Sequence, residues 1–513
     1  MTNSHSPIEL SATSRWLGFA AMCVGMFMAI LDIQIVATSL PAIKDSLKID
    51  ADRMSWIQTS YLIAEVIAIP LTGLLSRALS IRGLFLIALS LFCVASLGCA
   101  LSPDFETLIA FRILQGLSGG CLIPLVFSAV FLLFPVKQQA LATTLAGVMA
   151  VLAPTLGPTI GGYITETYSW PWLFLVNIGP GALSLLIAAR LLKTPGGAPS
   201  LLKSLDIASL LLLALSLASL EIALKQGPEL GWRAGWVLGL LVLFVGASVG
   251  FCVRTLHREQ PLVDLGLLKE RNFAIACVAS FLFGIGLFGS VYMMPVFLGL
   301  VRGFDALAIG LIMLVTGIAQ LISAPLAVQA EKRFDPRWLT TLGFAVFAAG
   351  LGASAFETPR SGYEEMFWPQ VLRGAAIMFC LLPVTRIALG NLPEKDVPDG
   401  SALFNLMRNL GGAIGIALID TVIWQRSEGH GTALGQRLLQ GDREAADFVG
   451  IPYEMLPKPG QAPSQEQIDL ARPLLEKAGL TMAINEAWAL VAALSLVGLL
   501  LLPLARKPRA EGQ

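Results

Sequence analysis

Long apolar runs, separated by short polar segments, dominate the chain. Most runs reach about 20 residues, which is the length an α-helix needs to cross a bilayer. The connections contain glycine, proline or charged residues, which end helices. A transmembrane β-barrel would instead show alternating segments of about 10 residues. The pattern predicts an all-α polytopic membrane protein with fourteen spans, at residues 16–38, 55–75, 83–101, 106–133, 140–163, 171–192, 206–225, 235–253, 273–300, 307–329, 338–356, 366–390, 401–424 and 483–504.

Composition supports this interpretation. Of the 513 residues, 55% are hydrophobic and 14% are charged, whereas soluble domains carry roughly 25% charged residues. These values exclude a soluble enzyme, a disordered chain and a coiled coil. The net charge is zero, so nothing indicates binding to nucleic acid.

Several kinds of chemistry are not expected. The seven cysteines lie in apolar runs without a close loop pair, and three histidines are too few for a cluster. We therefore expect no disulfide framework, no metal site and no cofactor. The phosphate-loop pattern G-x-x-x-x-G-K-[ST] is missing from the sequence, so the chain has no ATPase of its own. The protein is not expected to be an enzyme.

The distribution of basic residues predicts the orientation. The polar segment 1–15 lacks the features of a cleavable signal peptide. With this segment in the cytoplasm, the cytoplasmic connections hold about half of the 35 lysines and arginines, and the short outer loops hold far fewer. Because cytoplasmic loops are enriched in these residues, we expect both 1–15 and 505–513 to be cytoplasmic.

An internal repeat divides the chain. Pro70 is followed after seven and twelve residues by basic side chains, and so is Pro325. The string RILQG at 112–116 is answered by QVLRG at 370–374. Repeated halves with a binding site between them are typical of transporters. We therefore predict two six-helix bundles at 16–192 and 255–504, with two inserted helices within 193–254.

One polar segment, residues 425–480, is too long for a simple connection. It lies on the outer side between the last two predicted spans, with Pro452, Pro457, Pro459 and Pro463 near its centre. A flexible loop and a docking element for a partner protein are both open interpretations.

Three motifs carry a resemblance to a known family. LDIQIVATSLP (31–41) resembles the helix-1 signature of fourteen-helix drug:proton antiporters, RILQGLSGG (112–120) resembles their helix-4 motif, and LAPTLGPTIGG (152–162) resembles their helix-5 antiporter motif. The chain thus looks like a member of the EmrB/QacA-type branch of the major facilitator superfamily. It departs from the family pattern at Arg77, which stands where the first cytoplasmic loop motif has an aspartate.

Ionisable groups at bilayer depth are costly and mark functional sites. Asp32 and Arg112 are expected at similar depth, with Gln115 one turn from Arg112 on the same face. The resemblance implies that the helix-1 acid and the helix-4 arginine take part in proton coupling, although a static ion pair is the alternative. Glu65 lies near the membrane centre, where it could carry a proton or simply bond a neighbouring helix. Glu221 is a further deep acid.

Other groups in the spans have structural interpretations. We expect Arg373 and Asp420 to form an ion pair within the second half, and Arg386 and Arg408 to reach the cytoplasmic interface. In the antiporter motif, glycines permit close helix packing and prolines permit bending. The residues concerned are Pro154, Gly157, Pro158, Gly161 and Gly162.

The predicted function is proton-coupled export of small hydrophobic or amphipathic compounds across the inner membrane. The partners are the substrate, protons and the lipid bilayer. Resemblance to the EmrB type also implies a periplasmic adaptor protein and an outer-membrane channel. The alternatives are an exporter or facilitator for one metabolite or siderophore, and a membrane sensor that transports nothing.

Overall fold

The computed structural model describes residues 11–49, 51–54, 56–203, 206–258, 261–456 and 464–506, and within these ranges it is entirely helical. Fourteen of the helices are long and apolar enough to cross a membrane. The predicted fold class and number of spans are therefore confirmed. The first ten residues, the last seven, and Pro457, Pro459 and Pro463 lie outside the described residues.

The first half supplies six spans, the sixth formed by α7 and α8 together. Its helices are α1 (Ala12–Leu47), α2 (Ala51–Met54), α3 (Trp56–Leu79), α4 (Ile81–Ala100), α5 (Phe105–Leu133), α6 (Val136–Thr167), α7 (Trp172–Leu175) and α8 (Ile178–Leu191). The inserted segment contains α9 (Ser200–Lys203), α10 (Ile207–Leu230) and α11 (Gly235–Leu256).

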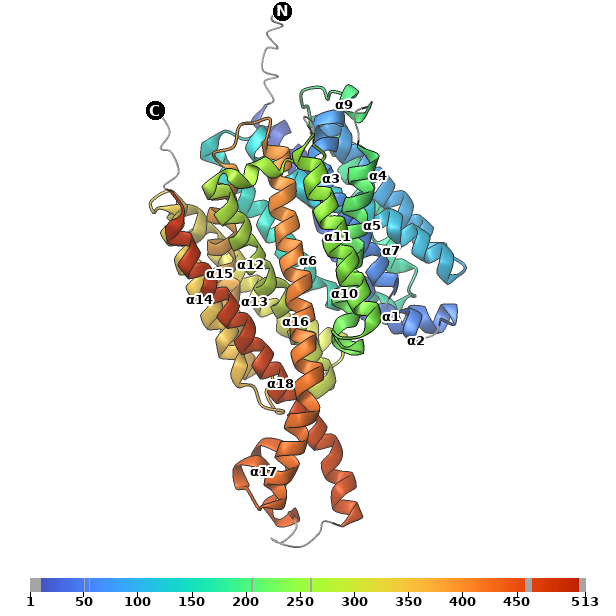
Figure 1. The fold of residues 1–513 in the computed structure, drawn as a ribbon, viewed down its shortest axis with the longest axis vertical. Helices are drawn as coiled ribbons and strands as arrows, with labels where there is room; N and C mark the ends of the chain where they lie inside the picture. The colour runs from blue at the N-terminus through green and yellow to red at the C-terminus, as the bar shows by residue number, and fades with distance from the viewer. Residues whose placement is uncertain are drawn as a thin grey trace, which may run out of the picture.

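The second half supplies the remaining six spans. Its helices are η1 (Leu265–Lys269), α12 (Arg271–Val296), η2 (Phe297–Val301), α13 (Ala306–Glu331), α14 (Pro336–Ala353), η3 (Ser354–Phe356), α15 (Tyr363–Leu389), α16 (Val397–Leu439), α17 (Arg443–Val449), η4 (Tyr453–Met455), α18 (Gln465–Leu501) and η5 (Leu502–Leu504). Helix α1 begins and α18 ends at the same end of the molecule, opposite α17 (Figure 1). We call these the termini end and the α17 end.

The sequence repeat corresponds to repeated packing. In the first half, Gly116 of α5 lies against the carbonyl oxygen of Tyr61 in α3. In the second half, Gly374 of α15 lies against the carbonyl oxygen of Thr316 in α13. A glycine at each position lets two helix backbones approach closely. The RILQG and QVLRG strings thus occupy equivalent helix crossings.

Helices α6 and α16 join the two halves. Helix α6 packs against α1 in its own half and against α13 across the interface, while α16 packs against α12 and against α3 and α5. At the termini end, Arg77 forms an ion pair with Asp399, and the Ser401 hydroxyl donates to the Pro124 carbonyl at 2.8 Å. These contacts tie the start of α16 to the first half.

The expectation for Arg408 is wrong, and that for Arg386 is only partly right. Arg408 is buried, bonds Asn405 and lies over the Phe127 ring across the interface, with 5.2 Å to its centroid. Its position between the halves leaves it no route to the membrane surface. The half-exposed Arg386 pairs with the buried Glu331 at 3.6 Å.

The segment 425–480 is not a flexible loop in the described residues. Helix α16 continues unbroken to Leu439 and α18 begins at Gln465, so both helices project beyond their spans (Figure 1). Helix α17 packs against both of them. Apolar side chains from all three helices form a small separate core, with Leu434, Leu438, Val449 and Ala478 among its members. We call residues 425–456 and 464–480 the extension.

Polar contacts fix the extension. Arg426 of α16 forms two hydrogen bonds of 2.9 Å with Glu486 of α18. Asp442 caps α17 and accepts a hydrogen bond of 2.7 Å from Arg437, which holds the pKa of this carboxyl below its ordinary value. The extension is therefore a folded element anchored on two spans.

The repeated glycine contacts lead to a stability prediction. Gly116→Ala and Gly374→Ala should each destabilise the protein by about 1–3 kcal/mol, because a methyl group would press on a facing backbone carbonyl. Gly239→Ala is the matched control, since the space around Gly239 in α11 is open. Thermal unfolding in detergent measures the effect. Equal melting temperatures for all three variants would contradict the proposed role of the glycines.

Candidate functional site

The structure brings Asp32 and Arg112 together, as the sequence predicts. Both side chains are fully buried, and Arg112 Nη1 lies 2.5 Å from Asp32 Oδ2. Asp32 comes from α1 and Arg112 from α5, so the contact joins two helices of one bundle. A charge pair without access to water is stable only when its remaining polar atoms also find partners.

Gln115 supplies several of these partners. Its amide nitrogen donates to Asp32 Oδ1 and to the Ser96 hydroxyl, at 2.9 Å each. Its oxygen accepts from Arg112 Nη1 at 2.8 Å. Gln115 therefore holds the acid and the arginine at once, which agrees with the orienting role expected from its i+3 spacing.

Arg112 does not form a bidentate ion pair with Asp32. Its Nε donates instead to the Ile57 carbonyl oxygen of α3 at 2.9 Å. The guanidinium also lies over the Tyr61 ring, 4.4 Å from its centroid. The arginine thus connects the acid of α1 to the backbone and an aromatic ring of α3.

Sequence reasoning missed Asn177, which completes the site. It precedes α8, is buried, and donates to Asp32 Oδ1 at 2.8 Å. Every hydrogen-bonding partner of Asp32 is a donor, so the arrangement fits a carboxylate. An asparagine among the apolar residues of a span was the available signal, because buried polar side chains need partners.

Glu65 lies in α3, one turn beyond Tyr61. It is 4% exposed and forms no hydrogen bond or ion pair within the described part of the chain. Its charge is close enough to interact with Glu221 of the inserted helix α10, and with Arg112 and Asp32. Glu65 lies nine residues after the start of α3, and Glu221 lies nine residues before the end of α10. Both of these helix ends lie at the α17 end of the molecule, so both acids are roughly 14 Å from it along the helix axis. The inserted segment therefore brings a second acid to the depth of Glu65.

The antiporter motif occupies the middle and end of α6. Pro154 and Pro158 lie inside the helix, and Gly157 packs against Gln34 of α1. Gly161 is buried, and its carbonyl oxygen accepts a bond of 2.8 Å from Thr165; the next residue is Gly162. Because α6 also packs on α13, the motif lies along the boundary between the halves.

The predicted pair of Arg373 and Asp420 does not form in the described residues. Asp420 accepts a hydrogen bond of 2.7 Å from the Tyr292 hydroxyl. Arg373 is buried, lies over the Trp488 ring at 4.7 Å, and its charge interacts with Glu357. Helical depth alone placed the two residues at one level, but their side chains face different helices.

A small void lies at the boundary between the halves. Arg373, Gln370 and Thr316 border this void of about 20 Å³ together with residues of α6 and α12. That volume holds about one water molecule. This void therefore has no room for a substrate as it stands.

Glu357 gives a pH prediction. It lies in the short connection before α15, where burial raises the pKa of its carboxyl to about 8 from an ordinary 4.5, against the charge of Arg373. Between these values the unfolded chain has lost a proton that the folded protein keeps, so stability should fall as pH rises from about 4.5 to about 8.

Between pH 5 and pH 8, the melting temperature of the Glu357→Gln variant should therefore fall less than that of the wild-type protein. Glu364→Gln, at an exposed neighbouring acid, is the control and should follow wild type. A parallel pH profile for wild type and Glu357→Gln would refute the assignment.

Comparison with known proteins identifies the family. The profile of the Major Facilitator Superfamily matches residues 22–416. Colistin resistance protein EmrB from Acinetobacter baumannii is 40% identical over 443 residues, which cover 85% of this chain and 86% of that protein. Multidrug export protein EmrB from Escherichia coli (strain K12) is 31% identical over 497 residues, covering 96% and 95%. Fatty acid resistance protein FarB from Neisseria gonorrhoeae is 30% identical over 431 residues, covering 82% and 84%.

A solved structure shares the fold. The human organic anion transporter MFSD10 (TETRAN) superposes with a TM-score of 0.62 at 15% identity, over 95% of this chain and 99% of that one. The resemblance seen in the three sequence motifs is thus confirmed, and the protein is a transporter and not an enzyme. The chain belongs to the major facilitator superfamily, in the branch of EmrB-type multidrug exporters.

Proposed function

We propose that the protein is a proton-coupled antiporter that exports small hydrophobic or amphipathic compounds across the inner membrane. The observation that carries the proposal is the buried contact between Asp32 and Arg112, with Gln115 and Asn177 on the same carboxylate. Asp32 is the acid that exchanges the proton, and Arg112 is the group that controls its affinity.

The coupling follows from a change in contact. With Arg112 and two amides on its oxygens, Asp32 is held as a carboxylate. Separation from the guanidinium would leave a charge in a medium of low polarity, where the neutral acid is favoured. Arg112 is bonded to Ile57 of α3, so a shift of α3 against α1 would move it away from Asp32. Proton uptake thereby accompanies a rearrangement of the first half.

Glu65 and Glu221 form a second acidic position beside this contact. Glu65 lacks a hydrogen-bonding partner among the described residues, so no hydrogen bond there stabilises it as a carboxylate. We assign it as a second proton carrier or as the counter-charge of a cationic substrate. Its neighbour Glu221 extends this position onto the inserted helices.

The relatives favour a broad range of substrates. Their printed names refer to multidrug export, colistin resistance and fatty acid resistance, which concern compounds of different charge and size. An exporter for a single metabolite has no such support. An inner-membrane location, with the termini end in the cytoplasm, agrees with the excess of basic residues there.

The decisive variant is Asp32→Asn. It should abolish substrate export driven by a pH gradient, because an amide cannot exchange the proton. Its melting temperature is measured alongside, because the substitution leaves the buried Arg112 charge without its counter-charge. The measurement is dye uptake into everted membrane vesicles across which a pH gradient is imposed. Asp305→Asn, at an exposed acid capping α13, is the control. Wild-type export by Asp32→Asn at equal expression would remove Asp32 from the mechanism.

Arg112 is tested in the same vesicles. The Arg112→Lys variant should export substrate poorly even though it keeps the positive charge, because an ammonium group cannot bond Asp32, Gln115 and the Ile57 carbonyl in the same geometry. Full export by Arg112→Ala would contradict its role.

The extension provides a surface for a periplasmic adaptor protein, which would carry substrate onward to an outer-membrane channel. Its length, its separate core and its position beyond the membrane support this assignment.

A deletion separates docking from transport. Gly431 lies close to Leu475, so a short Gly/Ser linker can replace 432–474 while Arg426 keeps its contact with Glu486. We expect weaker adaptor capture and lower cellular resistance, with vesicle transport retained. Unchanged adaptor capture would show that docking lies elsewhere, and loss of vesicle transport would place the segment in the gate.

A further inference from the structure

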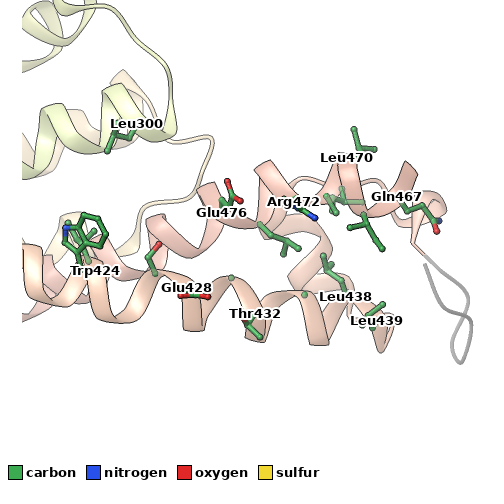
Figure 2. Close-up of a pocket in the computed structure, with 18 of the residues that line it drawn as sticks. Leu300, Trp424, Glu428, Thr432, Leu438, Leu439, Gln467, Leu470, Arg472 and Glu476 are labelled. Atoms are coloured by element: carbon green, nitrogen blue, oxygen red, sulfur yellow. The ribbon is translucent and has the colours of Figure 1, made fainter. Parts of the chain in front are cut away.

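A large groove runs along the extension. Its volume is about 1060 Å³, and it is formed by α12 and η2 near the membrane and by α16, η4 and α18 further out (Figure 2). Such a volume is at the upper end of small-molecule sites. The groove shares no lining residue with the small void between the halves, so the two are separate.

The groove begins at the membrane and continues well beyond it. Asp420 and Tyr292 mark its inner part, and the exposed Trp424 lies next along α16. Exposed tryptophans of this kind gather at membrane interfaces. Leu439 stands fifteen residues after Trp424, roughly 22 Å further along the helix. The outer part of the groove therefore lies in water.

Apolar side chains remain uncovered in this outer part. Leu439, Met455 and Leu470 line the groove and are each about half exposed, at 47%, 52% and 52%. Exposed leucines in the spans are covered by lipid, but lipid does not reach these three. An uncovered apolar surface in water marks a binding site.

The charged groups of the groove are mostly acidic. Glu428 of α16 and Glu476 of α18 both line the groove (Figure 2), and Asp420 lines its inner part. Arg472 is the basic residue among the lining side chains. Neither Glu428 nor Glu476 forms an ion pair with another described residue. The lining therefore combines apolar walls with unneutralised carboxylates.

We propose that this groove is a binding site for lipophilic cations, small compounds that join an apolar body to a positive charge. The apolar body packs on the leucine and methionine side chains, and the charge is attracted by the carboxylates of Glu428, Glu476 and Asp420. The inference deepens the proposed export function by giving compounds a site on the outer side after they leave the membrane. Binding itself does not require transport.

Tetraphenylphosphonium and tetraphenylborate make a matched pair of probes, with similar shape and opposite charge. Binding of each is measured to the full-length protein in nanodiscs, with empty nanodiscs subtracted. The Asp32→Asn variant serves as the background, so that failure of transport and failure of the groove are distinguished. This background protein, in which the groove is unchanged, should bind the phosphonium ion more tightly than the borate ion.

Two substitutions test the place of binding. Gly435 lines the groove and has room for a side chain, whereas Gly429 lies outside the lining in open space. Gly435→Leu should place an apolar side chain in the middle of the groove, obstruct the phosphonium ion and weaken its binding by about tenfold. Gly429→Leu adds the same side chain to the same helix and should bind like the background.

Two further substitutions test the charge. Glu428→Gln with Glu476→Gln should weaken phosphonium binding by about threefold or more, since the carboxylates are solvated, and should leave borate binding unchanged. If Gly435→Leu does not fold, Thr432→Leu on the groove wall replaces it. Equal phosphonium binding by the Gly435 and Gly429 variants would overturn the proposal.

Other occupants give different results. A phospholipid in the groove would co-purify with the background protein, disappear in Gly435→Leu and resist displacement by phosphonium, and this outcome would overturn the assignment. An adaptor helix in the groove would block phosphonium labelling only in the complex.

A diazirine derivative of the phosphonium ion should label peptides within 424–439 and 464–476, and labelling confined to other spans would also overturn the proposal.

Discussion

The contact between Asp32 and Arg112 determines how the first half is built. Two opposite charges with no access to water are costly unless their remaining polar atoms also find partners. Three helices and the turn before α8 supply most of these partners: α4 supplies Ser96, α5 supplies Gln115, α3 supplies the Ile57 carbonyl, and the turn supplies Asn177. Arg112 Nη2 has no hydrogen-bonding partner among the described residues. Each of the bonds that do form restricts how its helix can rotate. The electrostatic requirement of one acid therefore fixes the packing of the bundle, and a change at that acid is transmitted to all of its helices.

The two halves share their packing but not their chemistry. Gly116 and Gly374 make equivalent crossings, and the glycine and arginine positions repeat in sequence. In the first half the arginine meets an acid, whereas Arg373 in the second half lies over Trp488, and two of its nitrogens are without hydrogen-bonding partners among the described residues. It also borders the small void between the halves. The second-half arginine thus keeps unused hydrogen-bond donors beside this void, whereas the first-half arginine is engaged by an acid, an amide and a backbone carbonyl.

The spans, the repeat and the grouping of Asp32, Arg112 and Gln115 could be predicted from the sequence. These features depend on the length of apolar runs, on helical spacing and on depth in the membrane, all of which follow from position along the chain. The sequence was insufficient where a side chain chooses among several neighbouring helices. Arg373 and Asp420 share a depth but face different partners, and Asn177 reaches Asp32 from a helix 145 residues away. The extension was missed because its average polarity resembles that of a loop. Its helical signal was present in the spacing of Leu434, Leu438 and of Leu474, Ala478, which form its separate core.

The contacts that close the two ends of the interface are different in kind. At the termini end, Arg77 meets the buried Asp399, and Ser401 bonds the Pro124 carbonyl. At the α17 end, Thr159 of α6 packs directly on Gly310 of α13. Opening the first end exposes a carboxylate to water, which solvates it well, and so the loss of the ion pair is largely offset. Opening the second end separates closely packed small residues, whose attraction falls steeply with distance. Water can therefore compensate for opening at the termini end more fully than at the α17 end, where packing is lost and water gains access to the buried Thr159 hydroxyl.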